Sequence, residues 1–173
     1  KLNIDLNEEL GIRIFSFPMR YQPVTLKDRS HIGDNWNRYF LRSVQLILQA
    51  THGIVSGAPD FFRRAFGENQ EAFHDLLAMP HHFIFNREWY ANHGGKGELA
   101  TYKKAYGKLS QGDRDDLMEV LSSGPPSKWS KAFKASKNGA VRGLSPFYIS
   151  PTSNELSDIW KEMREKSSFN PND

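Results

Sequence analysis

Residues 34–53 read DNWNRYFLRSVQLILQATHG, and this stretch decides the fold class. Its apolar side chains recur at helical spacing, at Trp36, Phe40, Val44, Ile47 and Leu48. Such spacing places them on one face of an α-helix. Asp34 or Asn35 is expected to cap the amino end of this helix, and Gly53 is expected to end it.

The opposite face of this helix is polar and partly basic. It carries Arg38, Arg42, Gln45 and Gln49 at steps of four, three and four residues. Charged side chains are mostly exposed in folded proteins, so we favour a solvated face. A phosphate-binding face is the alternative.

Helical spacing continues through most of the chain. Short apolar groups end at glycine or proline, as Phe66 does before Gly67. We expect further helices around residues 59–66, 72–79, 81–92, 99–109, 113–121, 127–137 and 152–166. Residues 83–85 also fit a strand, although Phe85 and Trp89 are spaced as on a helix.

Two segments favour extended structure instead. Residues 12–17, IRIFSF, alternate as a strand does before Pro18 stops them, and residues 145–149, SPFYI, also look extended. We therefore predict a mainly α fold, a multi-helix bundle with one or two short strands near the amino end and around residues 145–149. Residues 1–173 are expected to form a single helical domain with a frayed tail at residues 167–173. Because a lone strand needs partners, the first strand is expected to complete a sheet supplied by sequence outside the chain.

Composition narrows the chemistry. The 173 residues include no cysteine, which excludes a disulfide, a thiolate nucleophile and a cysteine-bound zinc ion or iron–sulfur cluster within this chain. No apolar run approaches the roughly 20 residues that cross a bilayer, and we expect a cytoplasmic protein without membrane contact. A net charge of +3 and a pI near 9.1 favour phosphate-bearing or acidic partners only slightly.

The familiar catalytic patterns are not found. No serine stands in a Gly-x-Ser-x-Gly or Ser-x-x-Lys pattern, so we predict no catalytic residue. His74, His81 and His82 invite a metal interpretation, but the adjacent pair points to different faces of a helix or a strand, and no metal site is expected. The loop at residues 94–97, GGKG, could present amides and a lysine to a phosphate, but it matches no phosphate-binding loop, and we favour a linker.

Arg20 is the best single candidate for a ligand contact. It follows the predicted strand and lies between Pro18 and Pro23, whose fixed φ angles stiffen the loop. Residues at strand ends line ligand sites in parallel α/β sheets, so a contact to an anion or cofactor is expected. A structural role, such as capping a helix, is an equal alternative.

Basic and aromatic side chains also interleave in a way that suits nucleic acids, because phosphates pair with cations and bases stack on rings. The basic candidates are Arg38, Arg42, Lys128, Lys131 and Lys134. Amphipathic helices produce the same pattern, so we favour core packing for the aromatic residues. A nucleic-acid- or phosphate-binding helical module, or a protein-interaction domain, is the alternative function.

A family resemblance joins several of these residues. Residues 10–21, LGIRIFSFPMRY, are followed by Asp28-Arg29, Gly33, Trp36, Leu41-Arg42, Gln45 and Thr51-His52-Gly53. A second patch holds Leu76-Leu77-Ala78-Met79-Pro80 and Phe83-Ile84-x-x-Arg87. Together they cover the first third of the chain and one short stretch beyond it. This pattern resembles the carboxy-terminal part of certain radical S-adenosylmethionine (radical SAM) proteins.

The resemblance implies that the chain is a fragment of a longer protein. In that family a late barrel strand ending in a similar Ser-x-Pro-Met-Arg-Tyr sequence leads into a helical extension, so residues 1–24 would be a strand and linker of an upstream barrel. The Cys-x-x-x-Cys-x-x-Cys loop that binds the iron–sulfur cluster would precede Lys1, and the remainder of that polypeptide would be the partner.

The same resemblance implies cofactors and a role. S-adenosylmethionine and an iron–sulfur cluster are implied for the whole protein, and Ser16, Arg20 and Tyr21 are the residues implied to contact a cofactor. The chain would complete the barrel and cover the substrate side, and it would not be catalytic alone. Three thiolates would have to come from elsewhere, because this chain has none.

Overall fold

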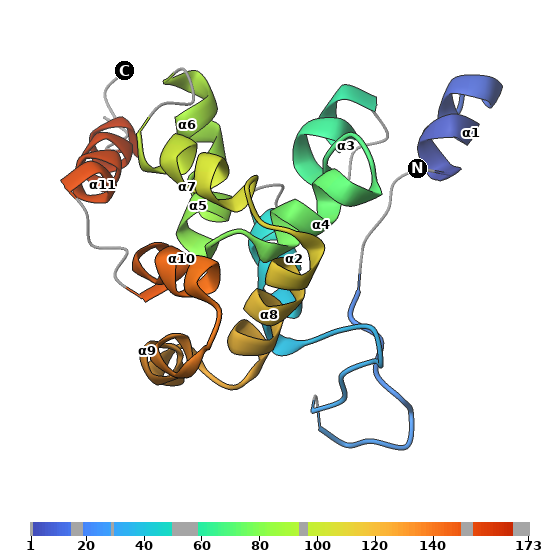
Figure 1. The fold of residues 1–173 in the computed structure, drawn as a ribbon. Helices are drawn as coiled ribbons and strands as arrows, with labels where there is room; N and C mark the ends of the chain where they lie inside the picture. The colour runs from blue at the N-terminus through green and yellow to red at the C-terminus, as the bar shows by residue number, and fades with distance from the viewer. Residues whose placement is uncertain are drawn as a thin grey trace. The chain divides into compact units, whose positions relative to one another are not determined.

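The computed structural model describes residues 2–14, 19–28, 30–49, 59–93, 97–149 and 154–167. These residues form eleven α-helices and no strand (Figure 1). The prediction of a mainly α fold is therefore confirmed. The chain divides into two compact units, Lys1–Phe85 and Asn86–Asp173, and each is described by itself. That the whole chain forms one domain stays a prediction.

The first unit is organised around its second helix. Its helices are α1 (Leu2–Leu10), α2 (Arg38–Gln49), α3 (Pro59–Phe66), α4 (Gln70–Ala78) and α5 (His81–Phe85). α2 contacts both α4 and α5. The shared core consists of the buried side chains Leu46, Ile47, Leu77 and Ile84. Burial of such side chains stabilises the unit by about 1.5–3 kcal/mol each.

Two hydroxyl groups of α2 join it to the carboxyl end of α4. Tyr39 Oη donates to the carbonyl of Met79 (2.6 Å), and Ser43 Oγ donates to the carbonyl of Leu77 (2.7 Å). The last carbonyls of a helix have no partner within the helix, and burial away from water would leave them unsatisfied. These side chains therefore satisfy carbonyls at the end of α4, as a helix cap does.

α2 begins later than predicted. Asn37, rather than Asp34 or Asn35, caps it, because Asn37 Oδ1 accepts from the backbone N–H of Phe40 (2.7 Å). Trp36 thus precedes the helix, and its side chain is 42% exposed instead of lying on the buried face. The predicted end at Gly53 lies outside the described residues.

The second unit is built around α10. Its helices are α6 (Arg87–Asn92), α7 (Glu98–Tyr106), α8 (Gln111–Ser122), α9 (Pro126–Ala135), α10 (Gly139–Ile149) and α11 (Asn154–Ser167). α10 contacts α7, α8 and α9. Phe133 and Leu144 are buried in this unit, and the hydroxyl groups of the buried Tyr102 and Tyr148 pair at 3.1 Å.

The predicted strand at residues 145–149 is wrong, because these residues form the last turns of α10. Val141, Leu144 and Tyr148 recur at helical spacing and are all buried. Packing of this face overrides the extended preference of the local sequence. Pro146 lacks the N–H that would bond to the carbonyl four residues earlier, and α10 continues through it.

The predicted strand at residues 12–17 is not supported either. Residues 15–17 lie outside the described ranges, and residues 12–14 belong to no helix or strand. The N–H and the carbonyl of Ile14 bond to the side-chain amide of Asn7 (2.6 and 3.0 Å), which takes the place of a strand partner. Asn7 lies on α1, a helix that the sequence interpretation missed. Gly11, in the left-handed region at φ +62°, follows the end of α1.

The other helices lie close to their predicted ranges, and residues 81–92 are helical as expected, although Asn86 divides them into α5 and α6. Ser110 caps α8, with Asp113 completing a capping box, and Pro125 takes the cap position of α9. The predicted tail lies outside the described residues after Ser167. Among the described helices, none has the length and apolar character to traverse a bilayer.

Candidate functional site

Arg20 and Tyr21 lie in a segment, residues 19–28 and 30–31, that we name the closed loop. The guanidinium of Arg20 donates to the backbone carbonyl of His31. The ring of Tyr21 packs edge-on against the imidazole of His31, with 5.6 Å between centroids and 79° between planes. Both contacts bring the start and the end of the segment together. This bond gives Arg20 a structural contact that closes the loop, and its predicted contact to an anion or cofactor stays a prediction.

Side-chain bonds to the backbone hold the middle of the closed loop. Gln22 Nε2 donates to the carbonyls of Leu26 (3.2 Å) and Asp28 (2.5 Å). Asp28 Oδ1 accepts from the hydroxyl and the backbone N–H of Ser30 (2.5 and 3.0 Å). The bonds from Ser30, first from its hydroxyl, lower the pKa of the Asp28 carboxyl. The loop thus has a defined conformation without regular secondary structure.

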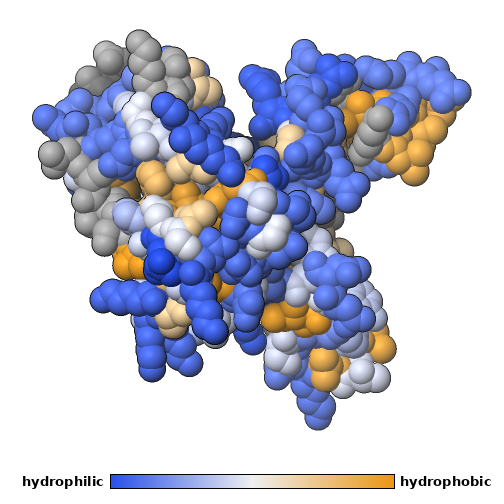
Figure 2. All heavy atoms as spheres, in the orientation of Figure 1, coloured by the Kyte–Doolittle hydropathy of each residue, from blue (hydrophilic) through white to orange (hydrophobic). Residues whose placement is uncertain are grey.

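The closed loop presents apolar side chains to solvent. Met19, Tyr21 and Val24 are 89%, 72% and 102% exposed. In Figure 2 the surface at the place of this loop, at the lower right, shows orange spheres among blue ones. Scattered apolar side chains are normal on a surface, but these three lie close in sequence on one pinned loop, where another surface can cover them.

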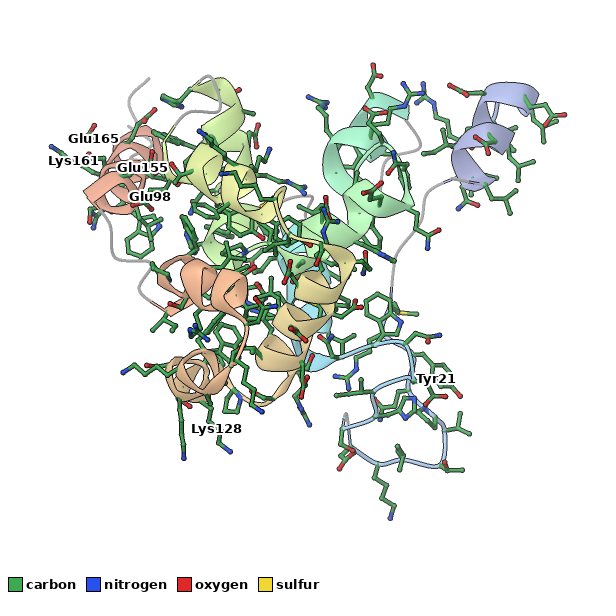
Figure 3. The ribbon with its side chains drawn as sticks, viewed as in Figure 1. Tyr21, Glu98, Lys128, Glu155, Lys161 and Glu165 are labelled. Carbon is green, nitrogen blue, oxygen red and sulfur yellow. The ribbon has the colours of Figure 1, made fainter. Side chains whose placement is uncertain are left out.

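The structure describes two of the three residues predicted to contact a cofactor. Ser16 lies outside the described residues. Tyr21 extends from the closed loop (Figure 3), and Arg20 has one donor engaged by His31. A guanidinium carries five N–H donors, so this bond leaves others for an anion.

The predicted basic candidates lie in different units. Arg38 and Arg42 are exposed on α2, where Arg42 Nη1 donates to Gln45 Oε1 (2.8 Å). The three lysines Lys128, Lys131 and Lys134 are exposed on α9, and Lys128 extends outward (Figure 3). Each group is considered by itself as a candidate surface.

Two of the histidines considered as metal ligands, His81 and His82, pack within the first unit. His81 stacks on the ring of Tyr39 at 4.2 Å and 18°. Burial lowers the pKa of His81 and that of His82 to about 4, and the charges of Arg42 and His81 respectively add to this. Within the described ranges no three metal-ligating side chains gather to hold an ion.

The amino end of α7, which follows the GGKG loop, is occupied by a carboxylate of the chain itself. Glu155 Oε2 accepts from the backbone N–H of Glu98 (2.9 Å) and from Tyr90 Oη (3.2 Å) (Figure 3). Gly97 adopts φ +83°, and a Cβ there would lie 1.7 Å from Glu155 Oε1. Burial, and then the nearby Glu155, raise the pKa of Tyr90. A carboxylate thus stabilises the positive end of α7 at the place considered for a phosphate.

Thr152 and Glu155 are spaced as in a capping box at the start of the last helix. Thr152 lies outside the described residues, and Glu155 bonds to α7 and to Tyr90 of α6. A second carboxylate of α11, Glu162, accepts from Trp89 Nε1 (2.6 Å) and lies 3.4 Å from His93 Nε2. The sequence signal for this pair is their spacing of two helical turns, which places both on one face.

Asn138, at the amino end of α10, is another residue whose role the sequence interpretation missed. Its side chain bonds to Asp113 of α8 and to the backbone of Ala140 in α10. The signal that could have found it is its position directly before a helix start, where Asn is a preferred cap.

Comparison with models of known protein families, with curated proteins and with solved structures finds no match. What the chain does must therefore be argued from its own residues and from the resemblance quoted above.

Proposed function

We propose that the chain is the carboxy-terminal, non-catalytic region of a radical SAM enzyme, whose closed loop packs against the preceding part of that polypeptide. The observation that carries this proposal is the exposure of Met19, Tyr21 and Val24 on a loop with a defined conformation. Covering each such side chain contributes about 1.5–3 kcal/mol, and a loop that is already closed loses little entropy when it docks. The family resemblance of residues 10–21 indicates that the partner is the preceding part of a radical SAM protein.

The residues of this chain do not fit the iron–sulfur cluster itself. The cluster is held by cysteine thiolates, and the chain contains none. The proposed role is therefore to complete the barrel and cover the substrate side, with Ser16, Arg20 and Tyr21 facing a cofactor held by the rest of the enzyme. Within this chain no reaction step is assigned to any residue.

The coding sequence before Lys1 gives the first test. The proposal expects a reading frame that continues upstream and encodes a Cys-x-x-x-Cys-x-x-Cys loop. A complete upstream reading frame without that loop would reject the radical SAM assignment, whatever the closed loop contacts.

Binding between separately expressed halves gives the second test. The polypeptide preceding Lys1 is expected to bind this chain, and Val24→Asp is expected to raise the Kd about tenfold or more, because it places a charge in an apolar contact. Thr101→Asp, at an exposed position of α7, is the matched control and should leave the Kd unchanged. Equal Kd values for both variants would show that the closed loop is not the docking surface.

A second candidate function rests on α9. Lys128, Lys131 and Lys134 are exposed along a helix, PSKWSKAFKA, that contains no acidic residue. Such a row suits the phosphates of a single-stranded nucleic acid, and the affinity should fall steeply with salt. Replacing all three lysines by glutamine should reduce the slope of log K against log salt by about 2. No measurable RNA or DNA binding by the unaltered chain at low salt would remove this candidate.

A further inference from the structure

The side-chain amide of Asn138 connects two helices of the second unit. Its Nδ2 donates to Asp113 Oδ1 (2.6 Å) and to Asp116 Oδ2 (2.8 Å), both on α8. Its Oδ1 accepts from the backbone N–H groups of Ala140 (3.0 Å) and Val141 (3.2 Å), in the first turn of α10. The two ends of the amide are thus not interchangeable: α8 requires the nitrogen and α10 requires the oxygen.

Asn138 is also the only asparagine of the 173 residues that is followed by glycine. We propose that Asn138 is a site of spontaneous deamidation, and that the resulting carboxylate breaks the contact between α8 and α10. Gly139 bears no Cβ that would hinder its nitrogen from approaching the Asn138 side chain. The reaction needs only water and involves neither the closed loop nor α9.

The chemistry has two steps. The backbone nitrogen of Gly139 attacks Cγ of Asn138, so that an N–Cγ bond forms and the Cγ–Nδ2 bond breaks. Ammonia leaves with the proton of the Gly139 N–H, and a cyclic imide remains. Water then adds across one of the two imide C–N bonds, which yields aspartate or isoaspartate and releases a proton. No oxidation or reduction occurs.

The aspartate product loses the bonds to α8 and can keep those to α10. An aspartate caps a helix as well as an asparagine, so the bonds to Ala140 and Val141 can persist. Towards α8, however, a donor becomes a third carboxylate beside Asp113 and Asp116, and like charges at hydrogen-bond distance repel. The bond from Asn138 is also the first cause that lowers the pKa of Asp113, and deamidation removes it.

The modification is tested by incubating the whole chain at mildly alkaline pH and mapping its peptides by mass spectrometry. Conversion of Asn138 to aspartate and isoaspartate is expected to exceed conversion at the other asparagines. Gly139→Ala is the matched control and should slow it about tenfold or more. A Cβ at position 139 meets only Arg142 Nη2, at 3.7 Å, so the fold should tolerate it. Equal conversion with and without Gly139→Ala, or an intact Asn138 in the unaltered chain, would overturn the proposal.

The structural consequence is tested with defined variants and urea unfolding at low salt. Asn138→Asp is expected to lower the equilibrium constant for folding about tenfold, and added salt should restore part of the loss. Asn138→Ser retains a cap without a charge and should lose less. The double variant Asn138→Asp and Asp116→Asn restores an amide donor opposite a carboxylate at the contact between α10 and α8, and it should recover stability. An Asn138→Asp variant as stable as the unaltered chain, or a double variant that is no more stable than Asn138→Asp, would refute the proposed repulsion.

Discussion

Single residues fix the second unit through contacts that allow little substitution. Gly97 has a backbone conformation of φ 83° and ψ −147°, which is almost confined to glycine, and the carboxylate of Glu155 fills the place of its missing side chain. Gly143, within α10, has neither constraint: nothing lies within 4 Å of a Cβ built there. The same substitution should therefore have opposite effects at the two positions.

Gly97→Ala is expected to lower the free energy of unfolding by about 1–3 kcal/mol, because it strains the backbone and displaces Glu155. Gly143→Ala should raise it by about 0.5–1 kcal/mol, because alanine is the better helix former. Urea denaturation followed by circular dichroism measures both. A Gly97→Ala variant as stable as the Gly143→Ala variant would contradict the described contact.

Histidine burial predicts a pH dependence for the first unit. The pKa of His81 and of His82 is lowered to about 4 in the folded chain, from 6.5 in the unfolded one. The unfolded state therefore binds protons first as the pH falls. Stability is expected to be constant above about pH 6.5 and to decrease between about pH 6.5 and about pH 4. The double variant His81→Gln and His82→Gln should flatten this decrease in urea titrations, and an unchanged decrease would show that other groups cause it.

At the scale of the element, local sequence determines where most helices lie and contacts determine how they begin and end. Apolar spacing located α2 and α7, but the cap of α2 was placed two or three residues too early, because several residues there are good caps. SPFYI looks extended by itself and is helical because Val141, Leu144 and Tyr148 pack on their neighbours. α1 could not be predicted from apolar spacing, because Leu2, Ile4 and Leu6 are spaced two residues apart, as in a strand.

Candidate sites are harder to predict than helices, because the decisive contacts join distant residues. Ser43 and Leu77 are 34 positions apart, and Glu98 and Glu155 are 57 apart. No pattern within one window of sequence contains such pairs. The exposure of Val24 could not be predicted either, since an apolar residue in a loop can be buried or exposed.

α11 is expected to dock on α6 and α7 mainly through the carboxylates of Glu155 and Glu162 and its buried Leu156 and Ile159. Glu162→Ala removes the acceptor of the Trp89 indole and should speed hydrogen exchange of the α11 amides at least about tenfold. Asp158→Ala, at an exposed position on the same helix, is the control and should change exchange little. Equal exchange in both variants would mean that Glu162 does not hold α11.

At the scale of the whole molecule, the chain comprises two compact helical units, and one of them carries an exposed apolar loop. Each unit has its own buried side chains, so neither needs the closed loop for its core. Burial of the apolar side chains of that loop can therefore contribute free energy of binding to another surface. This is why the proposed function assigns the chain a docking role and no chemistry of its own.

Hydrogen exchange of residues 19–28 tests this account most directly, measured by mass spectrometry in the chain alone and in the longer polypeptide that contains it. Amides whose loop becomes covered by another surface open less often and exchange more slowly. The account predicts at least about tenfold slower exchange of these residues in the longer polypeptide, with the amides of α9 unchanged. Equal exchange of residues 19–28 in both would contradict the docking of the closed loop.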